Sequence, residues 1–139
     1  VLYTVIVDAA HNPHGARALA SAIERDFDFA RLIGVLGILG DKDARGILAA
    51  LEPVMDEVVV TEVNSPRALP VDVLAEYARD AFGEERVHVA TNLPGAVELA
   101  TQLAEDDDQR DAVEVADADR FGQQVGDEPQ PQQDRKSVV

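Results

Sequence analysis

The sequence contains no cysteine and no tryptophan, and only 4% of its 139 residues are aromatic. Without cysteine no disulfide framework can form, so nothing favours an oxidising compartment. No stretch approaches the ~20 consecutive apolar residues that a membrane-spanning helix needs. The first residues also lack the charged start and apolar run of a signal peptide. We therefore expect a cytoplasmic protein.

An initiator methionine is also missing, because the chain begins at Val1 inside a largely apolar run. We interpret this as the start of a fragment whose parent chain extended upstream.

Basic residues are scarce: 12 Lys and Arg stand against 27 Asp and Glu, which gives a formal net charge of −15. A surface of this charge repels nucleic acids and anionic membranes, so neither is expected as a partner. The charge is uneven, since residues 1–104 hold 16 acids and 8 bases whereas residues 105–139 hold 11 acids and 4 bases.

The apolar residues are mainly Ala, Val, Leu and Ile. They form short continuous runs, and these runs alternate along the chain with segments in which apolar residues recur at helical spacing. Short apolar runs predict buried strands, and apolar residues three or four apart predict amphipathic helices. Alternating strands and helices with short connections indicate a parallel sheet with right-handed crossovers. We therefore predict an α/β fold, a Rossmann-like open, mostly parallel sheet flanked by helices, for a first domain at 1–104. The expected strands are 2–7, 32–39, 58–60 and 86–90. One expected helix begins at residue 13, and the other three cover 44–51, 71–82 and 93–104.

The segment 105–139 differs from the rest because it is acidic and rich in Gln and has almost no apolar pattern. Such a segment buries too little to offset roughly 1–2 kcal/mol of backbone entropy per residue. We predict a second region here, a disordered acidic C-terminal tail, with room for one short helix near Asp111 to Phe121.

Three polar loops follow the first three predicted strands, at 8–14, 40–43 and 64–67. Ligands of parallel sheets gather beyond the carboxyl ends of the strands, so these loops should share one edge. We expect this shared edge, rather than any single residue, to form an anion-binding site.

In the first loop, Asp8 ends a strand and can accept hydrogen bonds from the hydroxyl groups of a sugar. His11 and Asn12 stand at a predicted helix start, where free amides and the helix dipole favour a phosphate. Asn12 is equally well explained as a simple N-cap, with His11 and His14 as solvated residues.

The second and third loops carry cations. Lys42 could hold a carboxylate or a phosphate with Asp41 positioning it, and Arg67 suits the bidentate binding of a carboxylate. Alternatively, Lys42 lies in a charged turn before a helix and Arg67 is an exposed, solvated side chain. His88 lies on a predicted strand and is interpreted as a surface or packed residue.

These loops resemble those of a known family. Asp8-Ala-Ala-His-Asn-Pro-His14, Gly40-Asp-Lys-Asp43 and Asn64-Ser-Pro-Arg-Ala-Leu-Pro70 are similar to the C-terminal domain of folylpolyglutamate synthases and dihydrofolate synthases, in the Mur ligase superfamily. The first motif is the most specific of the three, and the resemblance covers about residues 2–104.

The resemblance implies an ATP-dependent amide ligase that adds L-glutamate to a folate, an activity that dihydrofolate synthase activity often accompanies in the family. By analogy Asp8, His11 and Asn12 contact the nucleotide, while Asp41, Lys42 and Arg67 face glutamate. No residue is assigned a catalytic or metal-binding role. ATP, glutamate and reduced folate are the expected ligands of a monomer, and Mg²⁺ is expected to bind to the family's N-terminal domain.

Two departures from the family pattern are visible. No Gly-x-x-x-x-Gly-Lys-Ser/Thr phosphate loop occurs, so the fragment is expected to be inactive alone. We also expect the polar tail to stand in place of the apolar strand that usually ends the domain. Two alternatives stay open: a non-catalytic nucleotide- or partner-binding module, and a cell-wall Mur-type amino-acid ligase domain. A phosphoacceptor receiver domain is disfavoured because the third strand ends at Thr61, not at Asp.

Overall fold

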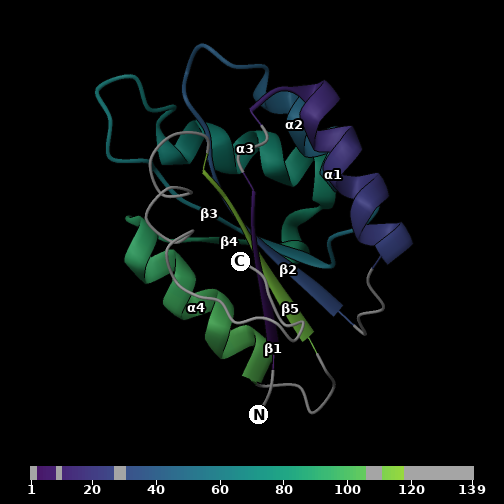
Figure 1. Ribbon diagram of the computed structural model, residues 1–139. Helices are drawn as coiled ribbons and strands as arrows, with labels where there is room; N and C mark the ends of the chain where they lie inside the picture. Colours follow the sequence, from purple (N-terminus) through teal and green to yellow (C-terminus); the bar gives the residue numbers. More distant parts are fainter. Residues whose placement is uncertain (1–2, 9–10, 27–30, 106–110, 118–139) are drawn as a thin grey trace.

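The computed structural model describes residues 3–8, 11–26, 31–105 and 111–117. Within these ranges a five-stranded sheet lies between helices on its two faces (Figure 1). This arrangement confirms the predicted α/β fold class. The strands are β1 Tyr3–Asp8, β2 Arg31–Gly37, β3 Glu57–Val60, β4 Val87–Val89 and β5 Asp111–Asp117. The helices are α1 Pro13–Asp26, α2 Ala44–Leu51, α3 Val71–Phe82 and α4 Leu93–Glu105, with a short 3₁₀ turn η1 at Glu84–Arg86.

The strands follow the order β1-β5-β2-β3-β4, and every described strand pair is parallel. In such a sheet all strands end at the same edge. The ends of β1, β2 and β3, which precede the three polar loops, therefore share one edge, as the sequence predicts.

Strand β5 corrects the prediction made for the acidic tail. We expected disorder or a short helix near residues 111–121, but residues 111–117 form a strand between β1 and β2. Val113 pairs in register with Val5 on one side and with Ile33 on the other. The final strand that the sequence seemed to lack is therefore present, and the sheet extends past the boundary expected at residue 104. The rest of the predicted tail, 106–110 and 118–139, lies outside the described residues.

The two faces of the sheet bury separate apolar clusters, and β2 contributes alternate residues to each. Leu32 and Leu36 pack in the larger cluster with residues of α1, α2 and α3. Ile33 and Val35 pack in the smaller one against the alanines of α4. This is the period-2 alternation of a strand that is covered on both faces. Figure 1 shows α4 on one side of the sheet and the other three helices opposite.

Local signals explain where the helices begin and end. Helix α3 stops at Gly83, whose φ of 92° lies in the left-handed region that glycine adopts without strain. Asn92 begins α4, because its side-chain oxygen accepts a hydrogen bond from Gly95 N at 2.8 Å. None of the helices in the described ranges is long and apolar enough to cross a membrane.

Candidate functional site

The carboxyl edge of the sheet carries the residues that the sequence singles out. We call the described residues of segments 8–14, 38–43 and 61–70 the rim. They follow strands β1, β2 and β3, which are parallel and therefore end together.

The second and third segments of the rim are joined through their backbones. Gly40 N donates to Arg67 O at 2.7 Å, and Leu69 N donates to Ile38 O at 3.0 Å. Between these bonds, Leu39 and Ala68 form an isolated antiparallel bridge. The connection after β3 is thus fixed to the end of β2, 27 or more residues earlier in the chain.

Side chains reinforce this junction. Arg67 Nη2 donates to Asp41 Oδ2 at 3.0 Å, although both side chains are more than half exposed. The hydrogen bond from Arg67 lowers the pKa of Asp41 below its ordinary value of 3.8. Asp41 therefore stays ionised at neutral pH, and the structure brings together two of the residues that the sequence assigned to one ligand.

Lys42 lies next to this pair and is partly buried. No ion pair of Lys42 exists with any described residue, whereas Arg67 is paired with Asp41. The neighbouring Asp43 caps α2, because its Oδ1 accepts from Gly46 N at 3.0 Å. The charged-turn interpretation of this loop is thus correct for Asp43, and the Lys42 charge stays available to an anion.

The start of α1 completes the rim. Asn12 Oδ1 accepts from Gly15 N at 2.7 Å, which confirms the simple N-cap interpretation of this side chain. His11 and His14 are exposed. A Cβ placed on Gly46 would lie only 2.6 Å from the ring of Pro13, so the first turns of α1 and α2 touch.

Asp8 ends β1 at the same edge but further along it. Its backbone is in register with Ala116 of β5, which is in turn in register with Leu36 of β2. Two strand spacings separate Asp8 from Leu36, or ~10 Å. Strand β5, which was not predicted from the sequence, therefore sets the distance between the first rim segment, at the end of β1, and the two segments that follow β2 and β3.

One residue of the rim was not predicted. Glu62 Oε1 accepts a hydrogen bond from Val71 N at 2.9 Å, across the whole loop that carries Arg67. Val71 is the first residue of α3, and the preceding Pro70 offers no side-chain cap. The available signal was a proline at the helix start, which cannot cap the helix with its side chain. The free amide of Val71 then needs another acceptor, and Glu62 lies nine residues upstream.

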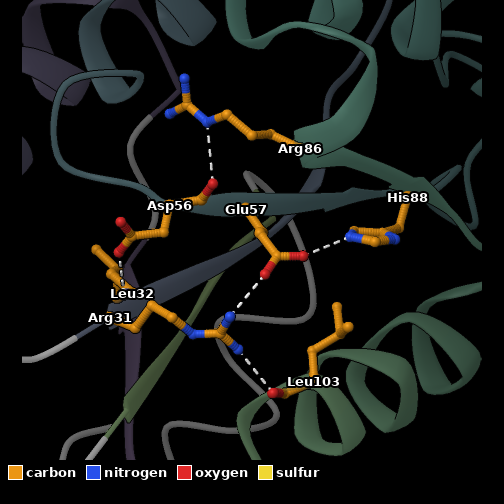
Figure 2. Close-up of polar contacts among 7 residues, drawn as sticks. All are labelled: Arg31, Leu32, Asp56, Glu57, Arg86, His88 and Leu103. Atoms are coloured by element: carbon orange, nitrogen blue, oxygen red, sulfur yellow. Dashed lines mark hydrogen bonds and ion pairs between the residues drawn. The ribbon is translucent and has the colours of Figure 1, made fainter. Parts of the chain in front are cut away.

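A second polar cluster lies at the opposite edge of the sheet, where β2 and β3 begin. Figure 2 shows Glu57 between Arg31 and His88, with Oε2 at 2.8 Å from Arg31 Nη1 and Oε1 at 2.6 Å from His88 Nε2. Arg31 Nη2 also donates to Leu103 O at 2.7 Å, near the end of α4. His88 is thus a packed residue, as interpreted from the sequence, and no sequence signal pointed to the cluster.

Comparison with known proteins agrees with this geometry. Residues 2–115 match the family model described as "Mur ligase, glutamate ligase domain". The dihydrofolate synthase/folylpolyglutamate synthase of Mycobacterium tuberculosis is 58% identical over 103 residues, which are 74% of this chain and 21% of that protein.

Solved structures give the same result. The M. tuberculosis folylpolyglutamate synthase complexed with ADP and AMPPCP superposes with a TM-score of 0.84 at 48% identity, over 91% of this chain and 30% of that one. The Escherichia coli FolC protein in complex with DHPP and ADP superposes with a TM-score of 0.64 at 30% identity, over 81% and 25%. The chain therefore spans less than a third of the proteins that it matches.

The family model covers most of the chain, and its last matched residues include most of β5. Both sequence and structure relatives agree with the family named from the three loop motifs. The chain belongs to the Mur ligase family, as a glutamate ligase domain of the dihydrofolate synthase/folylpolyglutamate synthase type.

Proposed function

We propose that this domain forms one wall of the active site of an ATP-dependent ligase that joins L-glutamate to a folate. Dihydrofolate synthase activity belongs to the same proposal. The observation that carries it is the junction of the second and third rim segments, where Arg67 and Lys42 flank Asp41 in an otherwise acidic protein.

The amino-acid side of the reaction is assigned to Asp41, Lys42 and Arg67. Glutamate enters with two carboxylates, and Arg and Lys are the side chains that bind carboxylates. Its amine must attack a folate carboxyl group that ATP has converted to an acyl phosphate. The C–N bond then forms, the C–O bond to phosphate breaks, and the amine loses a proton. In this scheme the rim binds and orients the nucleophile.

The nucleotide side is assigned to Asp8, His11 and Asn12. The solved relatives include complexes with ADP and with AMPPCP. In this chain the start of α1 favours an anion through its dipole. Asn12 Oδ1 is already used in the cap, so the side-chain nitrogen Nδ2 is the group that Asn12 offers to a phosphate, and the assignment of His11 rests on its position next to Asn12.

Magnesium is part of the proposal only through another domain. No group of three or more His, Asp or Glu side chains within the described ranges is placed to hold a metal ion. The proposal therefore assigns no Mg²⁺ ligand to these residues and routes no step through a metal. The proposal keeps the cytoplasmic location and the monomeric state expected from the sequence.

A hybrid enzyme tests the proposal. Residues 2–115 would replace the equivalent domain of the M. tuberculosis relative, and ATP-dependent joining of glutamate to a reduced folate would be measured. We expect turnover in the hybrid and a loss of more than tenfold in kcat/KM for glutamate in its Arg67→Ala variant. A folded hybrid that binds ATP but forms no product would contradict the proposal.

The 139-residue chain alone provides the second arm. We expect no ligation by the chain and only weak ATP binding in isothermal titration, because the phosphate loop is absent from the sequence. Micromolar ATP binding without ligation would instead favour the alternative of a non-catalytic nucleotide-binding module.

A further inference from the structure

Arg67 is held more firmly than an exposed arginine in a loop usually is. Its backbone N donates to Ser65 Oγ at 3.1 Å, and its backbone O accepts from Gly40 N at 2.7 Å. Its guanidinium donates to Asp41 at 3.0 Å. Backbone and side chain are thus fixed by three different residues, two of which belong to the segment after β2.

The loop that carries Arg67 is also closed at its base. Glu62 and Val71 lie at its two ends and are joined by the 2.9 Å hydrogen bond of the Glu62 carboxylate. Inside the loop, Ala68 N donates to Ser65 O at 3.1 Å. Arg67 therefore projects from a loop that is anchored at both ends and in the middle.

The guanidinium keeps most of its donors. An arginine side chain has five N–H groups, and the bond to Asp41 uses one of them, at Nη2. The others have no partner among the described residues. A second carboxylate can therefore bind to Arg67 without displacing Asp41.

We propose that Asp41 is a positioning residue rather than a ligand: it holds the Arg67 guanidinium so that its remaining N–H groups bind a carboxylate of the incoming amino acid. This inference rests on the proposed function, because it refines the role of one residue in the glutamate site. It separates Asp41, which acts through Arg67, from Lys42, which has no ion-pair partner in the described part of the chain.

The experiment uses the 139-residue chain and two readouts. The first is ¹⁵N relaxation of the Arg67 Nε–H group, which reports how ordered the guanidinium is. The second is a glutamate titration followed by the chemical shifts of rim amides. The variants are Asp41→Asn, which removes the charge, and Asp41→Glu, which keeps it.

Asp80→Asn is the matched control. Asp80 pairs with Arg45 at 3.1 Å, and both side chains are about as exposed as those of Asp41 and Arg67. This variant therefore removes an ion pair of the same kind away from the rim.

We expect Asp41→Asn to make the Arg67 Nε–H mobile and to weaken glutamate binding by about two- to fivefold, the range that an exposed ion pair supports. Asp41→Glu should keep much of the order of Arg67 and much of the affinity for glutamate. Asp80→Asn should change neither quantity. If Arg67 stays ordered in Asp41→Asn, or becomes mobile while glutamate binds as before, the positioning role is wrong.

The two proposals fail in different ways. If glutamate shifts no rim amide even in the unchanged chain at millimolar concentration, the amino-acid site of the proposed function is contradicted for this domain. The relaxation data still decide whether Asp41 orders Arg67.

Discussion

At the scale of single residues, the pH response of the Asp41–Arg67 pair is the most direct test of the rim. The hydrogen bond from Arg67 lowers the pKa of Asp41, so its folded-state value lies below that of the unfolded chain. The contribution of such a group is fully present above the unfolded pKa and is lost as the pH falls through the folded pKa.

We therefore expect the pair to be intact at neutral pH and to open only in acid, below the ordinary Asp value of 3.8. A ¹³C titration of the Asp41 carboxyl group measures this midpoint. In Arg67→Gln the midpoint should rise toward 3.8, and an unchanged midpoint in that variant would show that Arg67 is not the cause.

Arg86 bonds to several separate parts of the described chain. Its guanidinium donates to the backbone oxygens of Glu52, Met55, Asp56 and Phe82 and pairs with the Glu52 carboxylate at 2.9 Å. It also lies over the Phe82 ring, 4.8 Å from its centre. These groups lie at the ends of α2 and α3 and just before β3, so the Arg86 side chain holds these three parts of the chain together.

Replacing Arg86 by Ala removes the donor from these carbonyls, and the bonds to Glu52, Met55 and Phe82 are partly buried. We expect the free energy of unfolding to fall by about 2–3 kcal/mol, as measured by urea denaturation. Arg45→Ala is the control, because Arg45 also has an ion pair and an aromatic partner but is 59% exposed. Its effect should stay below about 1 kcal/mol, and equal losses in both variants would contradict a special role for Arg86.

At the scale of elements, the cluster around Glu57 ties α4 to the sheet. Arg31 Nη2 binds the carbonyl of Leu103 in α4, while Arg31 Nη1 binds Glu57 of β3, which also contacts His88 of β4 (Figure 2). Only small residues of α4, Ala96, Ala100 and Ala104, are fully buried against the sheet. Alanines bury little apolar area, so the polar anchor should matter for this helix.

We expect Arg31→Met to raise hydrogen exchange in the last turns of α4 by about tenfold or more, equivalent to ~1.4 kcal/mol of local stability. Exchange in α2 and α3, on the other face, should change less. Arg25→Met serves as control, because the pair that Arg25 forms within the described ranges is an exposed one with Asp26. Uniform acceleration across all helices would instead indicate a global loss of stability.

The helices were predictable because their signals are local. Val71–Phe82 is bounded by Pro70 and Gly83, and Ala44–Leu51 follows the capping Asp43, so their predicted bounds match the structure. Strand β5 was not predictable in this way. Its apolar pattern is short and includes Glu114, and its stability comes from pairing with β1 and β2, more than 70 residues earlier in the chain. Such non-local pairing leaves little trace in the segment itself.

At the scale of the whole molecule, the rim was predictable from one topological rule, since parallel strands end at one edge. That rule brought Asp41 and Arg67 together. It did not predict Glu62 or the distance of Asp8, because these depend on a loop conformation and on the strand inserted between β1 and β2.

The position of β5 leads to the last prediction. Without β5, β1 has no described partner and β2 loses one of its two neighbours. Both strands would then present unpaired backbone groups beside an apolar face, which favours aggregation. A chain ending at residue 105 should therefore lose cooperative unfolding and expose apolar surface.

A chain ending at residue 117 keeps β5 and is the matched control. We expect it to unfold cooperatively in urea, with a sharp thermal transition, whereas the shorter chain binds a hydrophobic dye and aggregates. If the chain of 105 residues instead unfolds as cooperatively as the longer one, β5 is not part of the stable sheet. The domain boundary expected from the sequence at residue 104 would then be the right one. The distance of Asp8 from the junction of Asp41 and Arg67 would also be wrong, because β5 sets that distance.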